Sequence, residues 1–196
     1  MFNEPGKLNN KNAPPGQVIT KKFPVLTFGN TPTIDFENWR FSITGEIKTP
    51  IEWNLQDFLQ LEDITINAEF HCVTQWSNLD NSWTGIPFAK VLNKIILNAN
   101  VQYAMIHCYG NYSTNISLDV LMNDDVLFAT KHNNIPLSPD HGAPVRLIVP
   151  KRYGWKSAKW VKGIEFTKKN RPGFWESRGY HMEGDPIKEQ RYDTDQ

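Results

Sequence analysis

The chain has 196 residues, of which 39% are hydrophobic and 12% aromatic, and its formal net charge at pH 7 is zero. This composition predicts a folded protein, most simply one domain with a sizeable core, and excludes a disordered chain. The zero net charge argues against bulk binding to nucleic acid or to a membrane surface, and no stretch of the sequence is long and apolar enough to span a bilayer. Two cysteines, Cys72 and Cys108, are too few for a disulfide-rich scaffold, although one bridge between them is compatible with the sequence.

The first 37 residues are rich in proline and glycine and show little periodicity. This predicts an irregular arm, residues 1–37, in front of a domain over residues 38–196. The apolar run Phe23-Pro24-Val25-Leu26 is expected to dock the arm onto that domain. The amino terminus has neither the basic and apolar regions of a secretory signal nor a twin arginine, so we expect a cytoplasmic protein.

Several segments carry patterns of regular secondary structure. Residues 39–47 alternate apolar and polar side chains, which predicts a half-buried strand. Asn54 is expected to cap a short helix over the residues that follow it. A second helix is predicted from Pro87 through Leu97, and further strands over residues 101–108 and 145–149.

The strand predicted over residues 64–72 is the most informative of these elements, because every even position in it is apolar. Side chains alternate between the two faces of a strand, so Cys72 is expected to point inward with Phe70 while His71 points to the other face. A cysteine that faces inward at the end of a strand is well placed to meet a buried ligand.

The carboxyl-terminal run from Pro172 to His181 is aromatic but too broken by glycine to form a helix, and it predicts an ordered tail that wraps the domain. Short helices, strands and long loops follow one another without a regular βαβ repeat. This order predicts an α+β protein with a mixed sheet.

Cys72 has more than one interpretation. A lone cysteine is most often a small hydrophobic residue of the core, but its thiolate is also the ligand that zinc and redox-active metals select. The repeated dipeptides His71-Cys72 and His107-Cys108 allow a zinc site of two histidines and two cysteines. Zinc is the weaker interpretation, because adjacent residues in a strand face opposite ways and the close ligand spacing of structural zinc sites is missing.

Basic residues gather late in the chain: nine lysines or arginines and a single acid, Glu165, lie between Arg146 and Arg171. Arg146 lies in an otherwise apolar predicted strand, where a buried guanidinium requires an anion as its partner. Arginine binds phosphate through two parallel hydrogen bonds, and lysine acts on it as a point charge. Turn amides near Ser157 and Ala158 are expected to add a backbone nest for the same phosphate.

Two other interpretations of this basic segment stay open. A run of charge is most often a solvated loop. The interleaved aromatic residues Tyr153, Trp155 and Trp160 also fit a platform for single-stranded nucleic acid. Residues 146–171 would then be the surface of a cofactor-free module that binds anions or single-stranded nucleic acid, an alternative that the zero net charge and the apolar setting of Arg146 disfavour.

Several blocks of the sequence occur in the order found in one known family. They are Cys72-Val73 with Trp76-Ser77, Trp83-x-Gly85-x-Pro87, residues 141–150, residues 153–159, Pro172-Gly173-Phe174-Trp175-Glu176, Gly179-Tyr180-His181 and Gly184-Asp185-Pro186. With these blocks the chain resembles, over nearly its whole length, the molybdopterin-binding domain of the sulfite oxidase superfamily, whose mixed-sheet fold is therefore expected. It is most similar to the short stand-alone oxidoreductases of that superfamily and to the catalytic subunit of periplasmic methionine-sulfoxide reductase.

The resemblance implies a set of functional residues. Cys72 would supply a thiolate to molybdenum, whose other sulfur ligands come from the dithiolene of one molybdopterin. Trp76, Tyr153 and Lys156 are expected to act with Cys72 in catalysis, with Trp155 facing the substrate beside them. The remaining cofactor contacts fall on the arm, on the second cysteine and on the basic segment: Phe23, Pro24, Val25, Cys108, His141, Arg146, Ser157, Ala158 and Lys159.

The reaction implied by the resemblance is a two-electron oxygen-atom transfer on a small substrate, which is a sulfoxide, an N-oxide or a sulfite-like molecule. Sulfite oxidases carry an arginine shortly after the ligand cysteine and another near the active site. Here the first segment reads Val73-Thr74-Gln75-Trp76 and Lys156 replaces the second arginine, so a neutral substrate is expected at least as much as sulfite. The sequence shows no haem segment and no second β-sandwich domain, so the electron partner is expected to be a separate, unidentified molecule.

Overall fold

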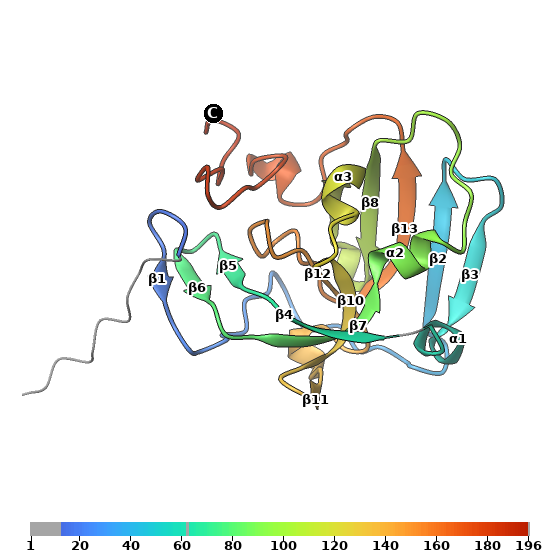
Figure 1. Cartoon of the computed structure of the whole chain (residues 1–196), viewed down its shortest axis with the longest axis horizontal. Coiled ribbons are helices and arrows are strands. Elements are labelled where there is room, and N and C mark those ends of the chain that lie inside the picture. Colours follow the sequence, from blue (N-terminus) through green and yellow to red (C-terminus); the bar gives the residue numbers. More distant parts are fainter. Residues whose placement is uncertain (1–12, 62, 196) are drawn as a thin grey trace, which may run out of the picture.

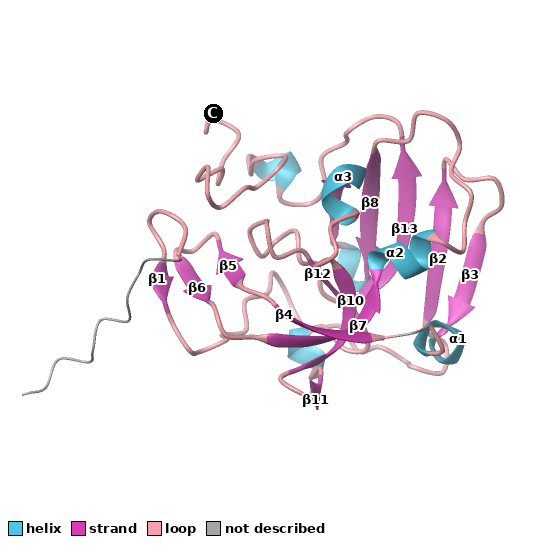
Figure 2. Ribbon diagram, in the orientation of Figure 1, coloured by secondary structure: helices cyan, strands magenta, loops and turns pink. Residues whose placement is uncertain are grey.

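The structure is a computed structural model that describes residues 13–61 and 63–195, so the first twelve residues of the predicted arm lie outside the described part. Helices in this part are short, namely α1 (Leu55–Leu59), α2 (Phe88–Leu92) and α3 (Leu118–Leu121), with 3₁₀ turns at Tyr109–Asn111, Pro139–His141 and Glu176–Arg178. Strands are β1 (Val18–Ile19), β2 (Arg40–Gly45), β3 (Ile51–Asn54), β4 (Ile64–Asn67), β5 (Phe70–Cys72), β6 (Trp76–Asn78), β7 (Ser82–Pro87), β8 (Tyr103–Cys108), β9 (Ser113–Ser117), β10 (Leu127–His132), β11 (Ile135–Pro136), β12 (Arg146–Ile148) and β13 (Val161–Thr167). Figure 2 shows a mostly β protein with few short helices, in agreement with the predicted mixed-sheet fold.

The strands form three sheets. One five-stranded sheet has the order β3-β2-β13-β8-β9, in which β2 and β13 are parallel and the other neighbours antiparallel. A second has the order β11-β10-β7-β4, with β12 paired to β10. The small sheet β1-β6-β5 lies at the opposite end of the molecule from β2 and β3 (Figure 1). The strand with the predicted ligand cysteine, β5, is therefore in the small sheet, away from β2 and β3.

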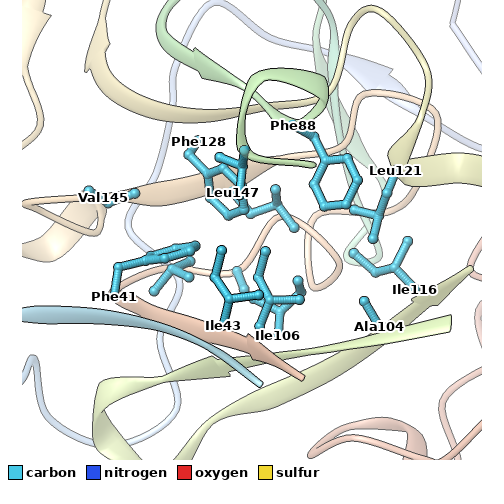
Figure 3. Close-up of a cluster of buried hydrophobic side chains, with 14 of the residues drawn as sticks. Phe41, Ile43, Phe88, Ala104, Ile106, Ile116, Leu121, Phe128, Val145 and Leu147 are labelled. Carbon is cyan, nitrogen blue, oxygen red and sulfur yellow. The ribbon is translucent and has the colours of Figure 1, made fainter. Parts of the chain in front are cut away.

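The main core fills the layer between the two larger sheets (Figure 3). Phe41 and Ile43 of β2 and Ile106 of β8 lie on one side of this layer, and Phe128 of β10 and Leu147 of β12 on the other. All five side chains are fully buried. Burial of a large apolar side chain is worth roughly 1.5–3 kcal/mol, so this layer supplies much of the driving force for folding.

Strands β10 and β12 are buried on both faces. Phe128 and Leu147 belong to the main core, whereas Leu127 and Ile148 belong to a second cluster on the far side of the sheet. Side chains two apart in a strand share a face, so Arg146 lies on the side of the second cluster with Ile148. The alternation of β12 thus directs a guanidinium away from the main core and toward the small sheet.

The structure confirms most of the local predictions. Strands β2, β8 and β12 lie within the segments predicted for them. Asn54 caps α1, because its side-chain oxygen accepts a hydrogen bond from the amide of Asp57 at 2.8 Å. The capping residue and the strand periodicity were therefore sufficient to locate these elements.

The prediction of one strand over residues 64–72 is wrong. β4 ends at Asn67 and pairs with β7, whereas β5 begins at Phe70 and pairs with β6 in another sheet. Between them the amide of Ala68 donates a hydrogen bond to the carbonyl of Asn81 at 3.0 Å. The apolar alternation continues across this break, so the sequence pattern did not reveal it.

The prediction of a helix over residues 87–97 is too long, because α2 ends at Leu92. Further along, the amide of Lys48 donates to the carbonyl of Ile96 and the amide of Asn98 donates to the carbonyl of Glu46, both at 2.9 Å. These bonds hold the chain extended beside the segment that follows β2, and they leave the Ile96 side chain 68% exposed. Tertiary pairing has overridden the helical pattern.

The arm and the tail lie on the same side of the molecule, next to the small sheet (Figure 1). In the arm, β1 pairs with β6 in parallel. In the tail, the amide of Phe174 donates to the carbonyl of Ser113 at 2.8 Å, and Asn115 donates to the carbonyl of Met182. The two segments also meet, because the rings of Phe28 and Phe174 are 5.0 Å apart.

Replacement of Phe58 by alanine should destabilise the protein far more than replacement of its neighbour Leu59. Phe58 is fully buried with its ring 4.7 Å from that of Phe41, whereas Leu59 is 50% exposed. We expect the free energy of unfolding to fall by about 3–5 kcal/mol for Phe58→Ala and by less than about 1 kcal/mol for Leu59→Ala. Urea denaturation followed by circular dichroism measures both, and equal losses would contradict the position of the core.

Candidate functional site

A cavity of about 330 Å³ opens where six segments meet: the arm, the β5–β6 hairpin, the turn between β8 and β9, the segment that leads into β12, the loop that follows β12, and the tail. These segments come from both ends and the middle of the sequence. The site is therefore produced by the tertiary fold and not by any single motif.

Cys72 lines this cavity at the end of β5. It is 8% exposed, and Phe70, two residues earlier, lines the same cavity, as the strand alternation predicted. The Thr74 hydroxyl lies 3.1 Å from the Cys72 sulfur, within hydrogen-bonding distance. The side-chain amide of Gln17 in the arm donates to the Cys72 carbonyl at 3.2 Å. The thiol thus has access to the cavity while its backbone is held from behind.

His71 lies outside the cavity, on the other side of β5. Its Nδ1 is 2.8 Å from the hydroxyl of Ser77, which donates to the side-chain oxygen of Gln17 at 3.2 Å. Burial lowers the pKa of His71 to about 4. The buried chain of hydrogen bonds from His71 to Gln17 fixes the arm against the β5–β6 hairpin.

The second cysteine occupies a different environment. Cys72 and Cys108 are both free, so they do not form a bridge. Cys108 is 1% exposed inside the main core, where burial raises the pKa of its thiol, and it does not line the cavity. Among the described residues no group of three or more histidine, cysteine, aspartate or glutamate side chains is arranged to hold a metal, which leaves the zinc interpretation without a site.

Arg146 supplies the principal charge in the cavity. Its side chain is buried, and it donates to the carbonyls of His141 at 3.1 Å and of Ser157 at 3.2 Å. Its Nε has no hydrogen-bond partner among the described residues, and burial lowers its pKa to about 9. The guanidinium lies 5.3–5.6 Å from the centres of three aromatic rings, those of Phe23, Phe70 and Trp83.

Lys159 and His141 lie next to this guanidinium and line the same cavity. Lys159 donates hydrogen bonds to the hydroxyl of Thr27 in the arm and to the carbonyl of Asp140. Burial, and then the charge of Arg146, lowers the pKa of Lys159 to about 8, and the same two causes lower the pKa of His141. An anion bound between these side chains would offset the repulsion between their positive charges, so such a cluster is expected to line an anion site.

Ser157 and Ala158 are held beside Arg146 by hydrogen bonds to β12 and the residue after it. The hydroxyl of Ser157 accepts a hydrogen bond from the amide of Val149 at 2.9 Å, and the carbonyl of Ala158 accepts one from the amide of Leu147 at 2.8 Å. Both residues line the cavity. The loop after β12 therefore folds back so that its backbone and the side chain of Arg146 share one wall.

The arm covers this cationic end. Phe23 and Pro24 line the cavity, and the ring of Phe23 lies 4.9 Å from that of Phe70. Val25, which was predicted with them, is 47% exposed and does not line the cavity. Its neighbours Pro24 and Leu26 both line the cavity, so Val25 is the residue of this stretch whose side chain points outward.

A second group of lining residues is aromatic, and we call this part of the cavity its aromatic end. The ring of Trp155 is 5.1 Å from that of Tyr180, and Tyr180 is 4.9 Å from Trp175. Burial is the main cause that raises the pKa of Tyr180, and the neighbouring Tyr192 and Cys72 raise it further. Tyr180 lines the cavity together with Cys72. This aromatic end is formed by Phe28 of the arm, Tyr112, Trp155 and the tail residues Phe174, Trp175 and Tyr180.

Of the four predicted catalytic residues, the structure places Cys72 and Trp76 on the cavity and the other two behind its wall. Tyr153 is fully buried and stacks on Trp155 with ring centres 5.4 Å apart. Lys156 is also buried, and its ammonium lies 2.5 Å from the carboxylate of Glu176. Trp155 and Ser157, not Tyr153 and Lys156, present this loop to the cavity.

Sequence reasoning missed several lining residues. Thr27 and Phe28, which the arm contributes after Val25, belong to no recognisable motif. Tyr112 and the aromatic residues of the tail had a signal, the density of aromatic side chains in a segment without periodicity. Gln17 had none, because a glutamine that supports another residue's backbone looks like any polar residue in a loop.

The nine basic residues between Arg146 and Arg171 do not form one unpaired surface. Arg146 and Lys156 are buried. Lys151, Arg152, Lys168 and Arg171 each lie within 4.0 Å of a carboxylate.

The described part of the chain contains no helix long and apolar enough to cross a membrane.

The cavity of this β-rich fold combines the thiol of Cys72 with the buried guanidinium of Arg146, a pair of groups suited to a cofactor that carries both a metal and an anionic group. Comparison with known proteins agrees. The family model described as "Oxidoreductase molybdopterin binding domain" matches residues 28–175. The chain therefore belongs to the oxidoreductase molybdopterin-binding domain family.

Individual relatives extend this assignment. The chain is 40% identical over 183 residues to "Uncharacterized oxidoreductase YuiH" of Bacillus subtilis (strain 168), covering 93% of this chain and 92% of that protein. It is 24% identical over 173 residues to "Putative protein-methionine-sulfoxide reductase subunit YedZ1" of Azospira oryzae, covering 87% of this chain and 66% of that one. The sulfane dehydrogenase SoxCD of Paracoccus pantotrophus has a similar fold, with a TM-score of 0.64 and 21% identity over 71% of this chain and 40% of that one.

The residues present fit a molybdopterin. The Nε of Arg146 has no partner among the described residues, and Lys159 and His141 line the cavity beside it, so this part of the lining would hold the phosphate of the cofactor. Cys72 offers a soft sulfur donor on the same cavity. The arm residues Phe23 and Pro24 close the cavity from above the cationic end with apolar surface.

His132, which lies close to Arg146 and His141, should make the free energy of unfolding sensitive to acid. Burial, and then Arg146 and His141, lower the pKa of His132 to about 4. Its ring stacks on Trp83 at 4.2 Å, and its Nε2 lies 2.9 Å from the side-chain oxygen of Asn81. Because the folded-state pKa lies below the unfolded value, the unfolded chain binds more protons between about pH 6.5 and pH 4, and stability falls as the pH falls through that window.

We expect His132→Phe, which keeps the stacking but cannot be protonated, to remove this component. At about 1.4 kcal/mol per pKa unit, the wild type should lose roughly 2–3 kcal/mol more than the variant between pH 6.5 and pH 4. Urea denaturation at several pH values measures the difference. Parallel curves for the two proteins would contradict the assignment.

Proposed function

We propose that this protein is a molybdenum-dependent oxidoreductase that carries out two-electron oxygen-atom transfer on a small substrate, with Cys72 as the protein ligand of the metal. The observation that carries the proposal is the presence of the Cys72 thiol and the uncompensated Arg146 guanidinium on one cavity, in a chain that belongs to a molybdopterin-binding family. The substrate class is a sulfoxide, an N-oxide or a sulfite-like molecule.

Each end of the cavity has its own task in this proposal. Arg146 and Lys159 bind the phosphate of the cofactor, with His141 and the backbone of Ser157 and Ala158 beside them. When bound, the molybdenum supplies the two-electron redox chemistry of the oxygen-atom transfer. The protein's own contribution is to present one thiol, to exclude water with the arm, and to orient the substrate.

The substrate approaches from the aromatic end, close to Cys72. Trp76 and Trp155 line the cavity, whereas Lys156, for which the sequence predicted a catalytic role, is buried behind Trp155. Most side chains that line the cavity are aromatic or aliphatic, which favours a small molecule with an apolar body. Cys108 lies in the core, so we assign it no contact with the cofactor.

We also propose a separate electron-transfer partner. The described chain contains no cluster of metal-binding side chains that would hold a second redox centre. The relative from Azospira oryzae carries the word "subunit" in its name, which supports an assembly of more than one chain. Electrons for the molybdenum would then arrive from that partner.

Arg146→Met should lose the cofactor. Removal of a charged hydrogen-bond partner of a buried anion costs about 1.5–3 kcal/mol, or roughly 10–100-fold in affinity. We expect about one molybdenum and one pterin per chain in the wild type and far less in the variant, measured by metal analysis and by fluorescence of the released, oxidised pterin. Lys151→Met is the matched control, because Lys151 lies in the same basic segment, 59% exposed and outside the cavity.

Substitutions of the two free cysteines distinguish the proposed metal ligand, Cys72, from the thiol in the core, Cys108. We expect Cys72→Ser to lose the thiolate-to-metal absorption and to reduce molybdenum content by about tenfold or more, whereas Cys108→Ala should keep both. An unchanged spectrum in Cys72→Ser would refute the ligand assignment. A wild-type chain without molybdenum, purified from cells that load another molybdopterin protein, would refute the enzyme and leave residues 146–171 as an anion-binding segment.

A further inference from the structure

Lys156 carries a charge that is buried and compensated. Its side chain is 1% exposed, and its ammonium lies 2.5 Å from Oε1 of Glu176. It also donates to the backbone and side-chain oxygens of Asn115 at 2.8 and 3.0 Å. With three oxygen partners, this ammonium has no donor left for a ligand in the cavity.

The same carboxylate oxygen of Glu176 connects three parts of the fold. Besides Lys156, it accepts a hydrogen bond from the hydroxyl of Thr114 in β9 at 2.7 Å and from the indole Nε1 of Trp155 at 3.1 Å. Glu176 is fully buried at its side chain and begins the 3₁₀ turn of the tail. The tail is therefore fixed to β9 and to the loop after β12 through one charged, buried group.

Trp155 is the member of this network that reaches the cavity. Its ring stacks on Tyr153 and meets Tyr180 edge to face. Gly184 packs so closely against it that an added Cβ would lie 2.7 Å from the ring. Together with the hydrogen bond to Glu176, these contacts leave the indole a single orientation at the aromatic end.

The aromatic end has no free charge. The cavity residues that carry a basic group, His141, Arg146 and Lys159, gather around the cationic end, and the lining includes no aspartate or glutamate. The lysine nearest to the aromatic end is Lys156, and Glu176 cancels its charge. A substrate that enters beside Cys72 therefore meets aromatic rings and no ion to balance an anionic group.

We propose that Glu176 is a specificity-determining residue: by neutralising Lys156 and orienting Trp155, it makes the aromatic end select neutral substrates with an apolar body, such as sulfoxides, over oxyanions. This inference rests on the proposed function of the cavity. A carboxylate that does not touch the substrate thus decides the charge that the substrate must have.

The physical consequence of removing the carboxylate is specific. Glu176→Gln leaves a glutamine that still reaches Thr114 and Trp155 but no longer cancels the buried ammonium. An uncompensated ammonium in a low-dielectric environment either loses its proton or is stabilised by an anion that approaches it, and the second outcome gains as the pH falls. The variant should therefore attract an oxyanion to the aromatic end and hold the indole less firmly.

The test is isothermal titration of the molybdenum-loaded protein with two unreactive probes, sulfate and methyl phenyl sulfone, at several pH values between about 5 and 7, because a buried ammonium without its carboxylate loses its proton more readily as the pH rises. We expect the wild type to bind the sulfone and to discriminate against sulfate. In Glu176→Gln the affinity for sulfate should rise about tenfold and that for the sulfone should fall several-fold. The double variant Lys156→Met/Glu176→Gln, which has neither charge, should discriminate as the wild type does.

Glu165→Gln serves as the matched control, because Glu165 is a carboxylate at the surface, paired with Arg171 and away from the cavity. Its ratio of sulfate to sulfone affinity should equal that of the wild type. An unchanged ratio of sulfate to sulfone affinity in Glu176→Gln would overturn the inference. A raised sulfate affinity in the double variant would overturn it as well, and this result can be obtained even where the single variant fails to fold. Because the probes are not turned over, failure here is distinct from failure of the proposed function, which is read from the molybdenum content.

Discussion

A guanidinium buried without a carboxylate is the constraint on which the rest of the site depends. Arg146 is carried into the interior by β12, a strand that is buried on both faces. The fold satisfies it only in part, with two carbonyls and three aromatic rings, and leaves its Nε unpartnered. Such an arrangement is unfavourable by itself and becomes favourable once an anion binds. The unpaired guanidinium therefore lowers the stability of the fold, and binding of an anionic cofactor would raise it again.

The two ends of the chain complete the site that the sheets begin. The arm contributes Phe23 above the cationic end, and Gln17 in the arm holds the backbone of Cys72. The tail contributes Glu176 and its neighbouring aromatic residues at the other end. Apart from the two-residue strand β1 and the 3₁₀ turn at Glu176–Arg178, both segments are irregular, so hydrogen bonds to strands and aromatic contacts position most of their length.

The chemistry of the site was easier to predict from sequence than its geometry. Cys72 and Arg146 stand out because a thiol at a strand end and a cation in an apolar strand are each chemically unusual, and the structure places both on one cavity. The break between β4 and β5 was not visible, because the apolar alternation runs through it. The true end of α2 was not visible either, because pairing with the segment after β2 decides it. Long-range contacts set both features, and local patterns do not encode them.

Lys156 shows why a residue's charge does not predict its role. Position in a motif suggested a lysine facing the substrate, but the neighbouring Trp155 takes that place and the ammonium pairs with Glu176, twenty positions later in the chain. A single carboxylate in the tail thereby changes the character of a site built mainly from the middle of the sequence. The cavity lining therefore has its basic side chains, His141, Arg146 and Lys159, in one part and a group of aromatic side chains without a charged partner in another. In the proposed function the first part would bind the cofactor phosphate and the second would select the substrate, so the two tasks would depend on different residues.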